Sequence, residues 1–241
     1  MKNAETLRAI CSGLIVSCQA RPGEPLAHPR IMTQLARAVV NGGASAVRAE
    51  GLENIRAVVQ GIDVPVIGLR KVGHDGVYIT PTLDDAHQVA DAGAHVVAID
   101  GTRRPRPDGL TLQQTVQRLR KSRDVHVMAD CGSLGDAEHA IDAGADLIGT
   151  TLAGYTGERP ITTGPDLELL RQMVNLTTDV PVIAEGRYWT IDHVREAICI
   201  GADAVCVGSA ITRPTLITRR FATATSRVST TLPANLEPGD C

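Results

Sequence analysis

Short apolar runs that end abruptly in polar residues recur along this chain. The clearest lies within residues 180–187, where Val, Ile and Ala residues are followed directly by Glu185-Gly186-Arg187. A run beginning at Val66 ends in the same way at Arg70-Lys71, and a fainter one ends at Asp130. A brief apolar run bounded by polar groups is typical of a parallel strand that is buried on both faces.

A second pattern alternates with the first. At residues 43, 93, 144 and 201 a Gly-Ala pair ends an amphipathic segment, and an apolar run opens at once. The pairs recur about every 50 to 57 residues, which indicates an array of supersecondary units. Each interval holds two strand–helix pairs, so the chain is predicted to contain eight.

The pattern predicts eight strands alternating with eight helices, preceded by a short helix. The strands are expected near residues 14–18, 46–47, 66–69, 95–99, 125–129, 147–149, 180–187 and 204–207, and the helices near 30–40, 52–60, 83–92, 110–121, 136–143, 166–175, 191–200 and 216–225. This count favours an α/β fold, a (β/α)8 TIM barrel, over a doubly wound open sheet. A short amphipathic helix at 3–11, with Leu7, Ile10 and Cys11 on one face, is expected to plug the bottom of the barrel.

Length and composition fit one domain. The 241 residues match the roughly 250 residues of such barrels, and we assign residues 1–228 to the barrel and 229–241 to a disordered tail. The net charge of -3 gives no reason to expect a nucleic acid partner. No run approaches the roughly 20 apolar residues of a membrane span, and the N-terminus lacks the features of a signal peptide, so a cytoplasmic protein is expected.

The six cysteines show no C-x-x-C pattern and no spacing with His suited to zinc, which favours reduced thiols. Cys18 and Cys206 lie in apolar runs and are expected in the core, whereas Cys131 follows a strand and is expected to line a pocket. The seven His residues are scattered, with no H-E-x-x-H motif and no clustered carboxylates, so a metal site is not expected.

The exits of the last two predicted strands are glycine-rich. Gly186 and Arg187 follow the seventh strand, and Gly208 and Ser209 follow the eighth, with Arg213 a few residues beyond. Main-chain N–H groups of such loops approach phosphates, usually at this place in a barrel, and a guanidinium group adds a bidentate contact. The alternative is that each glycine only makes a turn.

Lys71 and Glu185 are the candidate acid and base. They follow the third and seventh strands, which stand opposite each other in a ring of eight. Proton abstraction next to a carbonyl needs a base whose pKa lies near the working pH, and burial can tune a lysine or a carboxylate to that range. The alternative is an ion pair at the barrel mouth. Arg70 and Lys71 point to opposite sides, and periodicity alone leaves open which one faces inward.

Further polar residues stand at other strand exits. Gln19, Arg48 and Asp130 are candidates for binding hydroxyls, an amide or a carbonyl oxygen, although Arg48 and Asp130 together also fit a structural salt bridge. The arginine-rich segment 103–107 is either a solvated loop or an anion contact at the mouth of the site.

Several stretches, in order, carry a resemblance to a known family: Ile15–Ala20, Glu24–Leu26, Val47–Ala49, Ile79–Thr82, Asp100–Thr102, Met128–Asp130, Ile148–Thr156, Val182–Arg187 and Val207–Pro214. Together they cover about residues 14–221, and the chain resembles the N-acetylmannosamine-6-phosphate 2-epimerases of sialic acid and amino-sugar catabolism.

The resemblance implies reversible conversion of N-acetylmannosamine 6-phosphate to N-acetylglucosamine 6-phosphate by exchange of the proton on C2, without metal or organic cofactor. It places Lys71 and Glu185 at the catalytic centre. It also implies a homodimer in which C-terminal helices are exchanged. The remaining implied site residues contact the sugar (Gln19, Arg48, Asp130) or surround the phosphate (Gly186, Arg187, Gly208, Ser209, Arg213).

Two positions depart from the family pattern. Val72 stands where a basic residue usually follows the lysine, and Cys131-Gly132 replaces a commoner apolar-Ser pair. The first change removes a positive charge that would lower the pKa of Lys71. Two alternatives remain: another isomerase or lyase of the phosphate-binding barrels, and a non-catalytic sugar-phosphate sensor.

Overall fold

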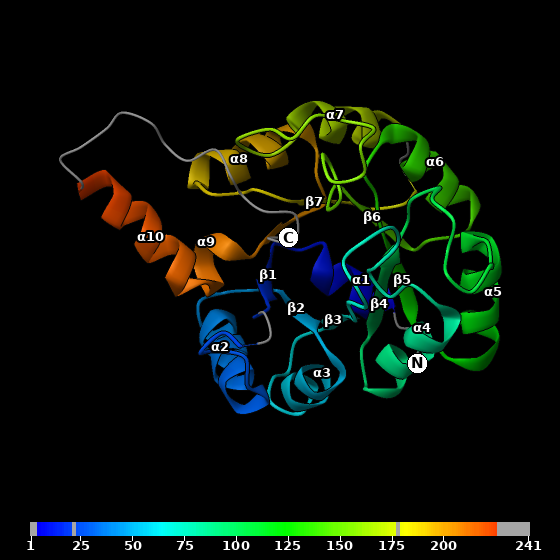
Figure 1. The fold of residues 1–241 in the computed structure, drawn as a ribbon, viewed down its shortest axis with the longest axis horizontal. Helices are drawn as coiled ribbons and strands as arrows, with labels where there is room; N and C mark the ends of the chain where they lie inside the picture. The colour runs from blue at the N-terminus through cyan, green and yellow to red at the C-terminus, as the bar shows by residue number, and fades with distance from the viewer. Residues whose placement is uncertain (1–3, 21–22, 177–178, 226–241) are drawn as a thin grey trace.

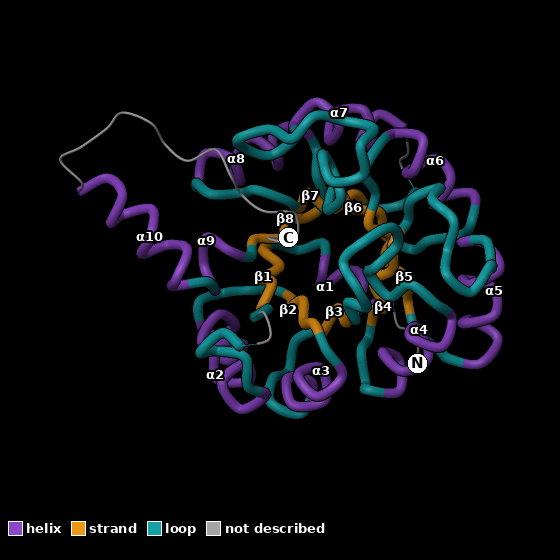
Figure 2. Tube along the Cα trace, viewed as in Figure 1, coloured by secondary structure: helices purple, strands orange, loops and turns teal. Residues whose placement is uncertain are grey.

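The apolar runs form one closed ring of eight parallel strands in the computed structural model, which describes residues 4–20, 23–176 and 179–225. The strands pair in chain order and β8 closes on β1 (Figure 2). They are β1 Leu14–Cys18, β2 Ala46–Glu50, β3 Val66–Leu69, β4 Val96–Asp100, β5 His126–Asp130, β6 Leu147–Gly149, β7 Val182–Glu185 and β8 Ala204–Val207. The (β/α)8 barrel is therefore confirmed, and the open sheet is excluded.

Helices surround this ring on the outside (Figure 1). The helices of the described residues are α1 Ala4–Ile10, α2 Pro29–Asn41, α3 Leu52–Val59, α4 Leu83–Asp91, α5 Leu112–Ser122, α6 Leu134–Asp142, α7 Leu167–Leu176, α8 Ile191–Ile200, α9 Ser209–Thr212 and α10 Pro214–Thr225. Most bounds lie within two residues of the prediction. In the described part of the chain, no helix combines the length and hydropathy needed to cross a membrane.

Two apolar clusters hold the barrel together, one on each side of the strands. The larger cluster fills the space between strands and helices, and the smaller one fills the inside of the ring. Ile10 of α1 is fully buried in the inner cluster, and Leu7 and Cys11 pack against it. The predicted plug at the end of the barrel is thus confirmed.

Alternation along each strand decides which side chains enter the ring. Ile67 and Leu69 of β3 belong to the inner cluster, as do Met128 of β5 and Ile183 of β7. Because side chains of a strand alternate with period two, every second residue beyond these positions also points inward. The polar residues at the carboxyl ends of several strands consequently converge above one apolar floor.

The repeated glycines have a common conformation. Gly43, Gly93, Gly144 and Gly201 have φ angles of 102°, 97°, 88° and 111°. This left-handed region is accessible to glycine without strain, and it lets the chain leave a helix and turn directly into the next strand. The period seen in the sequence is therefore the period of this helix-to-strand turn.

Three sequence expectations are wrong. β2 continues to Glu50, so Arg48 lies inside a strand and not at its exit. The chain after β8 forms two helices, because Arg213 is non-helical (φ -117°, ψ 78°) before Pro214, and a proline disfavours the helical conformation in the residue that precedes it. Cys131 is fully buried in the outer cluster and is not among the residues that line the cavity at the carboxyl ends of the strands. The expected tail, 229–241, lies outside the described residues.

Candidate active site

A cavity of about 740 Å³ opens at the carboxyl ends of the strands. Its volume falls within the range of roughly 300–1,000 Å³ that is usual for small-molecule sites. Eight of the ten residues singled out from the sequence line it: Gln19, Lys71, Glu185, Gly186, Arg187, Gly208, Ser209 and Arg213. The closed ring therefore brings together residues from the first, third, seventh and eighth strand exits.

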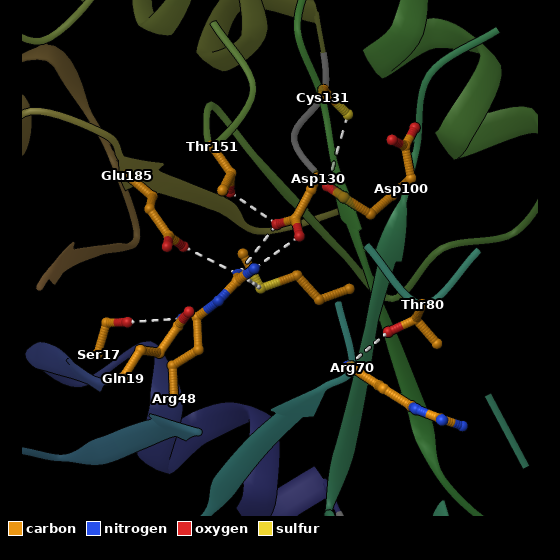
Figure 3. A network of polar contacts seen from close by, with 12 residues as sticks. Ser17, Gln19, Arg48, Arg70, Thr80, Asp100, Asp130, Cys131, Thr151 and Glu185 are labelled. Carbon is orange, nitrogen blue, oxygen red and sulfur yellow. Dashed lines mark hydrogen bonds and ion pairs between the residues drawn. The ribbon is translucent and has the colours of Figure 1, made fainter. Parts of the chain in front are cut away.

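The other two residues, Arg48 and Asp130, lie beneath the cavity in an ion-pair network (Figure 3). Arg48 Nη1 lies 2.9 Å from Asp130 Oδ1 and 2.9 Å from Glu185 Oε2, and Arg48 Nη2 lies 2.6 Å from Asp130 Oδ2. The Thr151 hydroxyl donates to Asp130 Oδ1 at 2.6 Å. Arg48 therefore bridges two acids, one of which, Glu185, also reaches the cavity.

Burial of the three side chains shifts the pKa values of Arg48 and Glu185. The exposed fractions of the Arg48 and Asp130 side chains are 1% and 0%, and that of Glu185 is 5%. Burial raises the pKa of Glu185 and the nearby Asp130 charge raises it further, against the opposing effect of Arg48. Burial alone would lower the pKa of Arg48, but the two carboxylates more than offset this and keep it charged. Glu185 is thus the member of the network most disposed to accept a proton.

Two small polar groups complete the inner wall. Gln19 Nε2 donates to the Ser17 hydroxyl at 2.9 Å, and both residues line the cavity. Cys206 stands opposite Glu185 in the β7–β8 register, and burial raises the pKa of its thiol well above the ordinary value. A thiol in this state donates a hydrogen bond and does not act as a thiolate nucleophile.

The direction of Arg70 and Lys71, which periodicity left open, is settled by their contacts. Arg70 Nη1 donates to Asp85 at 3.0 Å and to Gln88 at 2.7 Å, both on α4, so its side chain lies outside the ring. Lys71 has the opposite parity and lines the cavity. It also forms an antiparallel bridge with Ile79, which turns residues 70–80 into a short hairpin at the mouth.

Arg187 uses its guanidinium group to hold the loop between β6 and α7. Its φ is +60°, and its guanidinium donates to the carbonyl oxygens of Ala153 (2.8 Å) and Gly164 (3.0 Å) and to the Thr162 hydroxyl (3.0 Å). It also lies 5.2 Å from the ring centroid of Tyr155. Arg187 is still part of the cavity wall, and its expected place around a phosphate stays a prediction.

Arg213 enters the cavity from the other side. Its guanidinium pairs with the Glu24 carboxylate, and its side chain is 11% exposed. An anion in the cavity would compete with Glu24 for this group.

The arginine-rich segment 103–107 is neither a simple solvated loop nor, as a whole, a lining of the cavity mouth. Arg103 pairs with Asp136 and Glu158, and Arg106 is buried against the carbonyl oxygens of Asp100 and Thr80. Arg104 alone lines the cavity, where it pairs with Asp100 at 2.7 Å. These arginines organise the β4–α5 loop, and one of them borders the site.

Several cavity or network residues were not singled out as site residues from the sequence, notably Glu50, Thr151 and Tyr155. Glu50 was readable in principle, because it has the same parity as Arg48, but the predicted strand ended too early. Among the described residues, no group of three or more His, Cys, Asp or Glu is placed to hold a metal ion.

A family model, a relative and a solved structure all match this chain to the same enzyme family. A family model described as "Putative N-acetylmannosamine-6-phosphate epimerase" matches residues 32–227. A Cutibacterium acnes relative named "Putative N-acetylmannosamine-6-phosphate 2-epimerase" is 58% identical over 89% of this chain and 94% of its own. A solved N-acetylmannosamine-6-phosphate 2-epimerase from Clostridium perfringens superposes with a TM-score of 0.85 at 37% identity, covering 90% of this chain and 95% of the other.

A more distant solved structure is similar in fold alone. Thiamine phosphate pyrophosphorylase from Pyrococcus furiosus gives a TM-score of 0.58 at 19% identity over 90% of this chain and 98% of its own.

Proposed function

Because this chain belongs to the N-acetylmannosamine-6-phosphate epimerase family, we propose that it interconverts N-acetyl-D-mannosamine 6-phosphate and N-acetyl-D-glucosamine 6-phosphate. The observation that carries the proposal is that Lys71 and Glu185, 114 residues apart in the sequence (185 − 71), line the same cavity. An amine and a carboxyl group that face one bound molecule supply the groups needed to move a proton at carbon.

The chemistry is proton exchange next to a carbonyl group. The open-chain sugar carries an aldehyde at C1, which makes the proton on C2 removable. As a base takes that proton, the C2–H electron pair forms a C1–C2 double bond and the aldehyde oxygen takes up the negative charge. Return of a proton to the other face of C2 restores the aldehyde with inverted configuration, so no net oxidation occurs.

Lys71 and Glu185 divide this work in one of two ways. In the first, Lys71 exchanges the proton, while Glu185 orients the Lys71 side chain and sets its charge state. In the second, the two residues serve opposite faces of C2. The raised pKa of Glu185 supports the second, because a carboxyl group that holds a proton more readily than an ordinary one can act as acid as well as base.

The remaining residues of the site have positioning roles in this proposal. Main-chain N–H groups of the loops at Gly186 and at Gly208-Ser209 surround the phosphate, and Arg213 exchanges Glu24 for a phosphate oxygen. Gln19 contacts the sugar from β1. Arg48 and Asp130 fix Glu185 from below and bind the part of the sugar that reaches the cavity floor.

The protein is further proposed to be a homodimer that uses α10. This helix extends away from the barrel (Figure 1), and none of its residues is buried. Phe221 is 72% exposed. An apolar helix face left in water is stabilised when a second copy covers it, and exchange of α10 between two copies would do so.

The test is turnover of N-acetylmannosamine 6-phosphate in D₂O, followed by proton NMR. The proposal expects the C2 proton signal of substrate and product to disappear during turnover, and Lys71→Ala to abolish this exchange. Lys121→Ala, at an exposed position on α5, is the matched control and should exchange at the wild-type rate.

Other outcomes would identify the alternatives. Product without deuterium would overturn the mechanism and indicate oxidation–reduction at another carbon. Tight binding without turnover would indicate a sugar-phosphate sensor. Turnover only of a different sugar phosphate would indicate another isomerase or lyase.

A further inference from the structure

Glu50 is an acidic residue of the cavity that no step above uses. It is the last residue of β2 and stands opposite Leu69 in the register with β3. Its Oε1 accepts a hydrogen bond from the main-chain N–H of Lys71 at 3.4 Å, and both residues line the cavity. The carboxylate of Glu50 therefore lies beside the segment that carries the candidate catalytic amine.

We propose that Glu50 is a positioning residue for Lys71, which it holds over the cavity and keeps positively charged in the free enzyme. This inference rests on the proposed function and names the group that prepares the lysine for it. It assigns to β2 a second task besides presenting Arg48.

The main chain around Lys71 is held from two sides. On one side the hairpin fixes it, since the Val72 N–H donates to the Tyr78 carbonyl at 3.0 Å and the Thr80 N–H donates to the Arg70 carbonyl at 2.6 Å. On the other side Glu50 provides the contact from β2. Loss of the Glu50 carboxyl group would remove this contact from β2.

The charges of the two residues are coupled. Burial raises the pKa of Glu50, and the Lys71 main-chain hydrogen bond and the charges of Lys71 and Arg70 act in the opposite direction. The reciprocal effect is that a charged Glu50 favours the ammonium form of Lys71.

Glu185 is engaged in a different contact. Its Oε2 lies 2.9 Å from Arg48 Nη1, so this oxygen is directed into the network beneath the cavity. Glu50 and Glu185 thus contact different groups, the main chain of Lys71 for Glu50 and the guanidinium of Arg48 for Glu185. This arrangement fits a mechanism in which Glu185 accepts the proton while Lys71 begins as the donor.

Other titratable groups also border the cavity and contribute to the charge state of Lys71. On the hairpin and the β4–α5 loop these are His74, Asp75, Tyr78 and Arg104. On the remaining walls they are Tyr155, Glu185, Arg187, Tyr188, Cys206 and Arg213. The Glu50 variants leave all of these residues unsubstituted, so a comparison of variants isolates the effect of Glu50.

The experiment compares Glu50→Gln with Glu53→Gln. Glutamine at position 50 retains the oxygen that accepts the Lys71 N–H and removes only the charge. Glu53, an exposed residue of α3 outside the cavity, loses the same charge three positions away. The pKa of the Lys71 amine is measured by amine labelling across pH, with each lysine resolved by mass spectrometry.

We expect the labelling midpoint of Lys71 to move to lower pH by about one unit in Glu50→Gln, because loss of a neighbouring negative charge favours the neutral amine. In the pH profile of kcat/KM, the inflection that reports Lys71 should also move to lower pH. The value of kcat should fall about tenfold or more, and KM should change less. Glu53→Gln should match the wild type in both. Glu50→Asp, which keeps the charge, should restore the wild-type midpoint in part.

An unchanged Lys71 midpoint in a folded Glu50→Gln protein would overturn the inference, as would an equal shift in Glu53→Gln. The proposed function is tested separately: it fails if the wild-type enzyme does not exchange the C2 proton in D₂O. A wild type that exchanges, with an unshifted Glu50→Gln, refutes only the role of Glu50.

Discussion

Arg48 and Asp130 meet end to end inside the barrel, with Arg48 Nη1 2.9 Å from Asp130 Oδ1 and Arg48 Nη2 2.6 Å from Asp130 Oδ2. The residues are 82 positions apart in the sequence, and at most 1% of either side chain is exposed. Taking both charges out of water is costly, and the two parallel hydrogen bonds, together with that from Thr151, offset the cost. The pair also fixes Arg48 where it can hold Glu185.

Asp130→Asn should therefore destabilise the protein markedly. The change leaves a buried guanidinium with Glu185 as its remaining acidic partner in the network, and removing one member of a buried pair costs about 3 kcal/mol or more. Urea unfolding followed by circular dichroism measures this loss. The double variant Arg48→Met with Asp130→Leu should lose less than Arg48→Met and Asp130→Leu combined, since the charges of Arg48 and Asp130 are removed together and neither is left without the other. Strictly additive losses would contradict the coupling of the pair.

Glu185 should make stability depend on pH. Its pKa in the folded protein lies above the ordinary 4.5, so between that value and the folded pKa the folded state binds more protons than the unfolded state. The contribution of Glu185 to stability therefore falls as pH rises through this window, by at most about 1.4 kcal/mol per pH unit. Glu185→Gln, which cannot ionise, should gain stability relative to the wild type between pH 5 and pH 7.5.

Urea midpoints of both proteins at the two pH values, with equal m-values, measure this difference. A difference between variant and wild type that stays constant with pH would show that the pKa of Glu185 is the same in the folded and unfolded states.

Arg187→Ala should loosen the loop between β6 and α7. The guanidinium donates to two carbonyl oxygens and a hydroxyl of this loop, and hydrogen bonds from a charged group contribute about 1.5–3 kcal/mol each. We expect faster amide hydrogen exchange in residues 153–164 and a higher KM, because Tyr155 borders the cavity. Arg171→Ala, on the surface of α7, should leave both unchanged.

Arg187→Gly should be more stable than Arg187→Ala by about 1 kcal/mol, since the φ of +60° strains any residue with a Cβ atom. Equal stability of these two variants would show that the backbone relaxes once the guanidinium contacts are lost.

Phe221→Ser should weaken the proposed dimer. The wild-type chain is expected to have the mass of two copies by light scattering, and the variant should dissociate at protein concentrations where the wild type does not. Ile31→Ser, which replaces an exposed apolar residue of α2, is the control and should remain dimeric. A wild type that is monomeric at every concentration would refute the proposal.

The barrel and most of its element bounds could be predicted from the sequence, because the information is local. Val and Ile runs favour strands, and the glycines at 43, 93, 144 and 201 stop helices at a regular interval. The prediction failed where a polar residue lies inside a strand. Arg48 reads as the end of β2, yet the strand continues, since its side chain finds two acids on other strands.

Similarly, the grouping of candidate residues at strand exits was predictable, and their partners were not. The sequence by itself determined that Lys71, Glu185 and the glycine loops would end their strands on one face of a parallel barrel. Only the tertiary structure decided that Arg187 turns toward the β6–α7 loop, that Arg48 serves Asp130 and Glu185, and that Glu50 stands beside Lys71. The reason is physical: apolar periodicity is written into consecutive residues, whereas the partner of a buried charge depends on which strands the closed ring brings within hydrogen-bonding distance.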